Sequence, residues 1–116
     1  MDWTLEFASD AERDFELIFD HLAESYQTFG EPPSEAARRA VTRVLNIRSD
    51  ADRILTAPLR GESHDDILVG CRHLTIGSAS FWFVVDEANF VVTVLAVFFG
   101  GQNARRRMLV RLIGNT

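Results

Sequence analysis

Three consecutive segments between Ile67 and Phe99 have the composition of β-strands, and they constrain the fold more than any other part of the chain. Residues 67–76, 81–85 and 90–99 are rich in the β-branched and aromatic residues that fit a pleated sheet. The breaks between them contain the Gly, Ser, Asp and Asn that turns require, and they are short enough for antiparallel hairpins. We therefore expect a β-meander whose last strand, a nearly continuous apolar run, is central and covered on at least one face.

The start of the chain predicts a short strand followed by a helix. Apolar and polar side chains alternate over residues 3–7, which is the period of a half-buried strand. Ser9 and Glu12 have the spacing of a capping box, so a helix should begin there and end before Gly30. Its inner stripe is expected to contain Ala11, Phe15, Ile18, Phe19, Leu22, Tyr26 and Phe29, with acidic residues such as Asp14 off the stripe.

A second helix is predicted from Ser34, as N-cap, to about Leu55. Its expected inner stripe is Ala37, Ala40, Val41, Val44, Ile47, Ala51, Ile54 and Leu55. The small residues near its start allow close approach to the first helix. The two helices are therefore expected to form an antiparallel hairpin that packs on the sheet.

After the meander, Gly100 and Gly101 should end the last strand, and residues 102–113 return to a helical pattern. The predicted order is β-α-α-β-β-β with a short basic C-terminal helix. This is an α+β fold in which an N-terminal helical hairpin packs on a mainly antiparallel sheet. The length of 116 residues suits one domain, 1–116, with an ordinary core.

Composition excludes several classes of protein. The longest apolar run has the length of the last strand, too short to cross a bilayer as a helix, and the acidic start does not resemble a signal peptide. We expect a cytoplasmic protein with no membrane contact. The single Cys71 cannot form an intramolecular disulfide, which fits a reducing compartment. No cofactor or metal is expected.

Charge is divided unevenly along the chain. The net charge is −5, but residues 1–35 carry ten acids and one base, and the remainder carries seven acids and eleven bases. All the basic residues are Arg, which we attribute to codon composition. The acidic total disfavours tight or sequence-specific nucleic-acid binding, which depends on clustered cations.

Several polar clusters are candidate sites. Cys71 and His73 should share one face of a strand and Arg72 the other. A buried thiol beside a hydrogen-bonded imidazole is the favoured interpretation of that pair, and Arg72 is the better candidate for a contact with a partner or for an internal ion pair. The acids and histidine of residues 64–66 could hold a divalent cation but are more typical of a solvated turn, as are residues 86–87.

The end of the chain offers further candidates. Residues 100–102 match the Gly-Gly-Gln of peptide-release factors, but here the glycines serve to turn the chain. The cluster of Arg105, Arg106, Arg107 and Arg111 is either a solvated helix surface or a contact for a target. Aromatic residues of the meander, Trp82 among them, alternate across both sheet faces. One face should pack on the helices, and the other should need a partner chain to cover it.

This order of elements, with residues 58–61 forming a Pro-x-x-Gly loop before a strand that carries Arg72, resembles the RelE/ParE superfamily of bacterial toxins. The resemblance also rests on residues 70–74 and 81–87 and spans nearly the whole chain. It implies a small toxin encoded beside an antitoxin that wraps around it. RelE-like members cut mRNA on the ribosome with basic residues and often a Tyr or His, whereas ParE-like members poison DNA gyrase without a known hydrolytic centre.

The sequence departs from the nuclease pattern. Residues 80–83 are uncharged where RelE-like chains carry an Arg, and the terminal helix has neither Tyr nor His. We therefore favour a ParE-like gyrase inhibitor, a binding protein whose contacts with target or antitoxin involve Arg72, Trp82, Gln102, Arg105, Arg106, Arg107 and Arg111. The alternatives are a RelE-like mRNA endonuclease that uses Arg72, His73 and Arg105, and a non-toxic scaffold of the same fold that binds a partner.

Overall fold

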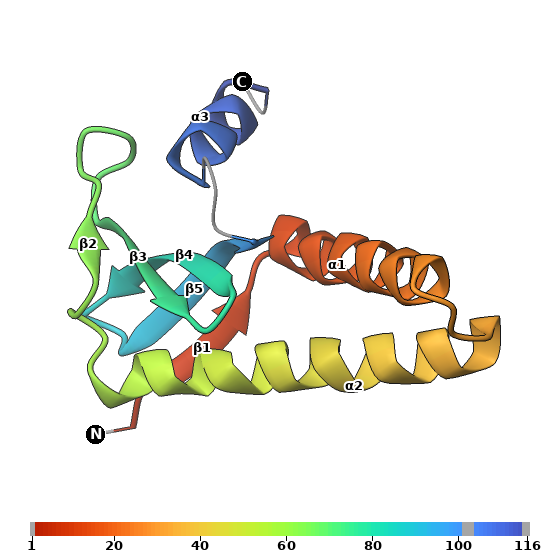
Figure 1. Ribbon diagram of the computed structural model, residues 1–116. Coiled ribbons are helices and arrows are strands. Elements are labelled where there is room, and N and C mark those ends of the chain that lie inside the picture. The colour runs from red at the N-terminus through yellow and green to blue at the C-terminus, as the bar shows by residue number, and fades with distance from the viewer. Residues whose placement is uncertain (1, 101–103, 115–116) are drawn as a thin grey trace.

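The structure is a computed structural model, and it describes residues 2–100 and 104–114, with the side chains of 104, 105 and 114 outside the description. Two long helices and a short C-terminal helix lie around a mixed sheet (Figure 1). The elements in chain order are β1 (Thr4–Phe7), α1 (Ser9–Thr28), α2 (Pro33–Asp50), η1 (Ala51–Thr56), β2 (Glu62–Ser63), β3 (Cys71–Ile76), β4 (Ala79–Asp86), β5 (Val91–Phe99) and α3 (Ala104–Gly114).

The strands form one sheet in the order β1-β5-β4-β3-β2. The strands β2 to β5 pair antiparallel, and β1 pairs with β5 in parallel. The predicted meander is therefore confirmed, and its apolar last strand lies inside the sheet with a neighbour on each side. The predicted α+β order is also confirmed, with the two-residue strand β2 added before the meander.

The predicted strand boundaries were wrong at two places. The first strand of the meander begins at Cys71 rather than Ile67, because residues 64–70 form a loop in which the amide of Gly70 donates to Asp65 Oδ1 at 2.8 Å. The turn after β3 contains two residues rather than four. Gly77 has a φ of 60°, the left-handed conformation that lets so short a connection return the chain.

The helical hairpin was correctly predicted, but its caps were not. Ser9 is the first residue of α1, and Ala8 is the N-cap without a side-chain hydrogen bond. Similarly, α2 begins at Pro33, before Ser34, after an N-cap at Pro32. Proline is favoured in the first turn because its fixed φ matches the helix and its missing N–H leaves no donor unsatisfied. The second helix tightens into the 3-10 segment η1 over the last residues of the predicted span.

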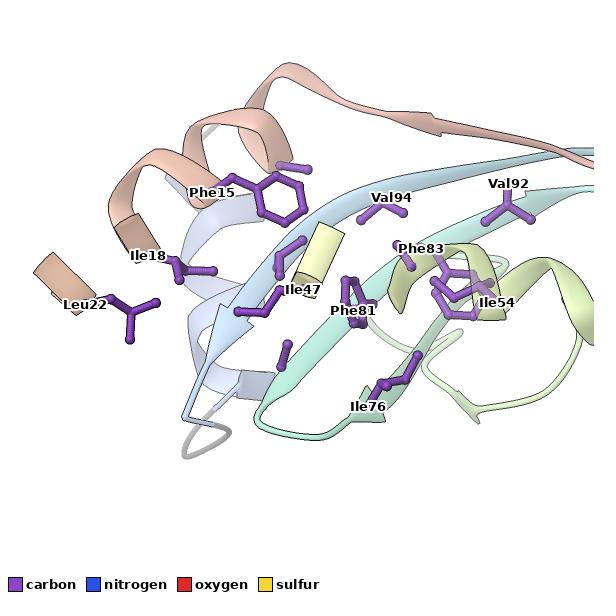
Figure 2. Close-up of a cluster of buried hydrophobic side chains, with 14 of the residues drawn as sticks. Phe15, Ile18, Leu22, Ile47, Ile54, Ile76, Phe81, Phe83, Val92 and Val94 are labelled. Carbon is purple, nitrogen blue, oxygen red and sulfur yellow. The ribbon is translucent and has the colours of Figure 1, made fainter. Parts of the chain in front are cut away.

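The main core lies between this hairpin and the sheet, as Figure 2 shows. Phe15, Ile18 and Leu22 of α1 and Ile47 of α2 point towards Phe81 and Phe83 of β4, Val92 and Val94 of β5, and Ile76 of β3. Two predicted core residues are instead at the surface. Phe29 is 88% exposed, because it follows the last turn of α1 where the hairpin extends beyond the sheet, and Val41 is exposed on α2.

No helix in the described parts of the chain is both long and apolar enough to cross a membrane.

Candidate functional site

The C-terminal helix α3 lies on the sheet face opposite the helical hairpin (Figure 1). A second, smaller core forms beneath it from Cys71, Trp82, Ala96, Phe98 and Met108. Met108 is the residue of α3 that is buried there. This corrects the prediction that the second face would expose large rings unless a partner chain covered it. The chain's own last helix covers the centre of that face.

An ion pair between Asp14 and Arg111 fixes α3 to α1. Arg111 Nη2 donates to Asp14 Oδ1 at 2.6 Å, and Arg111 Nη1 donates to Asp14 Oδ2 at 2.8 Å. Asp14 is only 4% exposed although it lies outside the hydrophobic stripe of α1, because it packs against β5 and α3. Hydrogen bonding to Asp14 is the main effect that raises the pKa of Arg111. The two-pronged geometry matches the fork of a guanidinium.

The same ion pair also forms hydrogen bonds with backbone groups at an open edge of the sheet. The register of β1 on β5 ends at Val94, so the rest of β5 has no strand on that side. There the Val97 amide donates to Asp14 Oδ2 at 2.8 Å, and the Leu95 carbonyl accepts from Arg111 at 3.3 Å. Asp14 and Arg111 therefore occupy the place of a missing strand, which leaves these backbone groups paired.

Arg106 and Arg107 of α3, together with Arg111, line a groove of about 550 Å³ between α1 and α3. Arg106 and Arg107 are exposed, and the Arg107 guanidinium lies 4.4 Å from the centre of the Phe98 ring. Leu17 and Val110 contribute exposed apolar surface to the same groove. Two predicted contact residues cannot be placed, because Gln102 and the side chain of Arg105 lie outside the described residues.

Two further predicted contact residues are not freely accessible. Trp82 is 1% exposed, beneath two histidine rings and α3, and its indole N–H donates to Ser80 Oγ at 3.1 Å. Arg72 lies in register with Phe83 of the main core, and its Nη1 donates to the Gly61 carbonyl at 3.5 Å. Its neighbour His73 pairs with Trp82 on the opposite face. The sheet therefore separates Arg72 from His73, as the strand period predicted.

A pair of histidines lies over Trp82 at the β2 edge of the α3 face. His64 Nε2 and His73 Nδ1 are 2.8 Å apart in a hydrogen bond. Both rings stack on the indole, with centroid distances of 4.4 Å for His64 and 4.9 Å for His73. The prediction that His73 would be hydrogen-bonded is confirmed, although His64 as its partner was not predicted.

Two groups on this face have shifted pKa values. Burial lowers the pKa of His73, and the neighbouring His64 adds to the effect, against the opposing influence of Glu62. Burial raises the pKa of the Cys71 thiol to about 11, with a smaller contribution from Asp65. The lowered pKa favours the neutral form of His73, and the raised pKa favours the protonated thiol of Cys71, which fits the predicted buried thiol.

Three side chains converge at the histidine pair and could hold a metal ion. The donor atoms of Glu62, His64 and His73 all lie within 4.8 Å of one another. This differs from the cation site considered over residues 64–66, because His64 turns towards Glu62 and His73 and the Asp65 carboxylate accepts from the Gly70 amide. The grouping was missed because its members come from two strands of a hairpin whose register the sequence did not reveal.

Comparison with known proteins supports the fold. No family model matches the chain, and no curated protein matches it. A chain of the chromosomal ParDE TA system from P. aeruginosa has a TM-score of 0.61 at 19% identity, covering 84% of this chain and 95% of that one. A chain of the toxin–antitoxin complex RelBE2 from Mycobacterium tuberculosis has a TM-score of 0.55 at 19% identity, covering 85% of this chain and 92% of that one.

A mutant of the E. coli toxin RelE in the free state is also similar, with a TM-score of 0.57 at 13% identity, covering 97% of this chain and 99% of that one. Proteins named for both branches suggested by the sequence are thus represented among the similar structures, and each of these three comparisons covers 84% or more of both chains. The chain has the fold of the RelE/ParE toxin superfamily.

Proposed function

We propose that this protein is the toxin of a type II toxin–antitoxin pair and that it acts as a ParE-like inhibitor of DNA gyrase. The fold supports the toxin role, since two of the similar structures are described as a ParDE TA system and a toxin–antitoxin complex. The protein would be a single-domain cytoplasmic binding protein whose own antitoxin neutralises it.

The observation that carries the choice of a binding mechanism is the separation of two nuclease candidates, Arg72 and His73, by the sheet. Phosphodiester cleavage needs a cation at the developing negative charge and a group that moves a proton, both at one place. Arg72 is the only Arg in the described strands, and it packs on the helical-hairpin side while His73 lies on the α3 side. The face beneath α3 is instead built mainly from apolar side chains.

The groove between α1 and α3 is the proposed contact for the target or the antitoxin. It combines exposed apolar side chains with Arg106 and Arg107 in an otherwise acidic protein, so an acidic amphipathic segment would match it. Arg111 supports this surface from below through Asp14 rather than by direct exposure.

The test is to express the chain alone in bacteria and to follow DNA, RNA and protein synthesis by pulse labelling. Early loss of DNA synthesis with gyrase-linked DNA breaks would support the proposal. The paired substitution Arg106→Glu and Arg107→Glu should relieve the inhibition, whereas the matched control Arg38→Glu with Arg53→Glu, in exposed parts of α2 and η1, should not.

The endonuclease alternative has one observation in its favour, which is the hydrogen bond between His73 and His64 at a position where burial lowers the pKa of His73. It predicts early arrest of translation with cut mRNA, and loss of cutting in His73→Gln with the fold retained. Normal growth on expression would favour the non-toxic scaffold over both toxin mechanisms.

A further inference from the structure

Glu62, His64 and His73 are placed on one face of the β2–β3 hairpin by its backbone. Glu62 lies directly opposite His73 in the antiparallel register. His64 follows Glu62 by two residues and so returns to the same face. The His64 amide donates to the Cys71 carbonyl at 2.8 Å, which continues the ladder beyond β2. The three side chains are thus positioned by strand pairing and not by a loop alone.

The three donor atoms are close to the spacing of one face of a metal coordination tetrahedron. His64 Nε2 is 2.8 Å from His73 Nδ1, and Glu62 Oε2 is 3.7 Å from the first nitrogen and 3.4 Å from the second. An ion with bonds to nitrogen and oxygen of about 2.0–2.2 Å in tetrahedral geometry separates its ligands by roughly 3.4 Å. The carboxylate is close to that spacing, and the two nitrogens need to part by about half an ångström.

Packing against Trp82 holds the two histidines in place, whereas Glu62 lies on the solvent side of the group. His64 is 4% exposed, and the rings of both histidines stack on the buried indole of Trp82. A Cβ on Gly61 would lie 2.6 Å from the His73 carbonyl oxygen, so the chain before Glu62 passes tightly against β3. The Glu62 side chain is 69% exposed and can close on an ion from the solvent side.

We propose that Glu62, His64 and His73 form a binding site for a divalent transition-metal ion, with Zn²⁺ as the preferred occupant. Two imidazoles and one carboxylate suit Zn²⁺, whereas Mg²⁺ and Ca²⁺ prefer oxygen ligands throughout. Three protein ligands leave a fourth position for water or for a donor from a partner. The site does not depend on whether gyrase or the ribosome is the target.

The first experiment titrates the metal-free full-length protein with Zn²⁺ by calorimetry and, separately, with Co²⁺ by visible absorption. The expected result is one Zn²⁺ per chain and the intense visible bands of tetrahedral Co²⁺. The Glu62→Gln and His73→Gln variants remove a ligand each and should bind Zn²⁺ at least about tenfold more weakly, since even the loss of a group that orients a ligand costs roughly 10–100-fold.

His21→Gln is the matched control. His21 is the one histidine of the sequence outside the proposed site, and it lies on the exposed side of α1, near Phe99. The His21→Gln variant should keep the wild-type Zn²⁺ affinity and the tetrahedral Co²⁺ spectrum. Zn²⁺ should raise the melting temperature of the wild type and of His21→Gln, and raise it less in His73→Gln, because a ligand that binds the folded state stabilises it.

Glu62 is exposed, so its replacement by Gln should not disturb folding, and this variant keeps the test decisive if His73→Gln folds poorly. Absence of Zn²⁺ binding to the folded wild type at millimolar concentration would overturn the proposal. So would octahedral Co²⁺ spectra, or Zn²⁺ affinity that is unchanged in Glu62→Gln and falls instead in His21→Gln.

Discussion

The two faces of the sheet are covered in different ways. On one face, a helical hairpin packs along the sheet and buries a continuous set of aliphatic and aromatic side chains. On the other, the short helix α3 inserts Met108 into a small core that contains the Cys71 thiol, and the Asp14–Arg111 ion pair and the histidine pair lie beside this core. The difference predicts that the first face supplies most of the stability, whereas the second face offers the proposed partner contacts and the proposed metal site.

The largest effect is expected from Phe81→Ala on the hairpin face. Phe81 is fully buried at the centre of the main core. Its truncation should lower the free energy of unfolding by about 3–5 kcal/mol, because both apolar burial and packing are lost. Urea denaturation followed by circular dichroism measures this. A loss below about 1 kcal/mol would show that the main core is not where the stability resides.

Asp14→Asn should have the next largest effect. The change leaves Arg111 opposite a neutral amide and weakens the cover of the open β5 edge. We expect a loss of about 2–3 kcal/mol, below the range for a fully buried pair because the Arg111 side chain is 21% exposed. Urea denaturation of Arg106→Gln gives the control, and this exposed position should change stability by about 0.5 kcal/mol or less.

Gly61→Ala tests the tight approach of the chain to β3. Gly61 has a φ of 104°, and an added Cβ would meet the His73 carbonyl oxygen. A loss of about 1–3 kcal/mol is expected from the strained backbone. Thermal unfolding measures it, with Gly30→Ala as the comparison. Gly30 has a similar φ of 102° but open space around it, so equal losses in the two variants would mean that the contact adds nothing.

The smallest effect on global stability is expected from Met108→Ala. If α3 docks as a separate unit, the loss is limited to its docking free energy, and we expect about 1 kcal/mol or less. Alkylation of Cys71, which lies beneath α3, measures how often α3 opens. Raising the thiol pKa from 9.0 to about 11 lowers the thiolate fraction at pH 8 about a hundredfold, so alkylation of the wild type should be slow.

In Met108→Ala the alkylation of Cys71 should become at least about tenfold faster, because opening of α3 exposes the thiol and brings its pKa back towards 9.0. The rate should also rise with pH in both proteins, since the thiolate is the reacting form. An unchanged rate, together with a loss of stability as large as that of Phe81→Ala, would show that the two cores unfold as one.

Local patterns predicted the elements well and their ends poorly. The strands of the meander and the apolar stripe of α1 follow from the spacing of apolar and polar side chains. Most of these elements could therefore be predicted from the sequence. The predicted N-caps Ser9 and Ser34 were wrong. The observed N-caps, Ala8 and Pro32, are compatible with a helix start in the same local sequence. The prediction that Phe29 is buried was wrong, because periodicity does not show where the sheet beneath a helix ends.

The candidate sites show the limit of such patterns. Arg72 and His73 were correctly assigned to opposite faces, because alternation is a property of a single strand. The pairing of His64 with His73 could not be foreseen, because it depends on the register of β2 on β3 and on a loop between them. Trp82 was expected at a contact surface and is buried, because only the packing of α3 decides which ring is covered.

The sequence alone determined the order of elements, the antiparallel meander and the hairpin of helices, because these follow from hydrophobic period and turn chemistry within short windows. Only the tertiary structure decided which charges are buried and which histidines meet. Asp14 and Arg111 stand 97 residues apart and look like surface residues in their own helices. They pair because both reach the open edge of β5, a position that exists only once the sheet has formed.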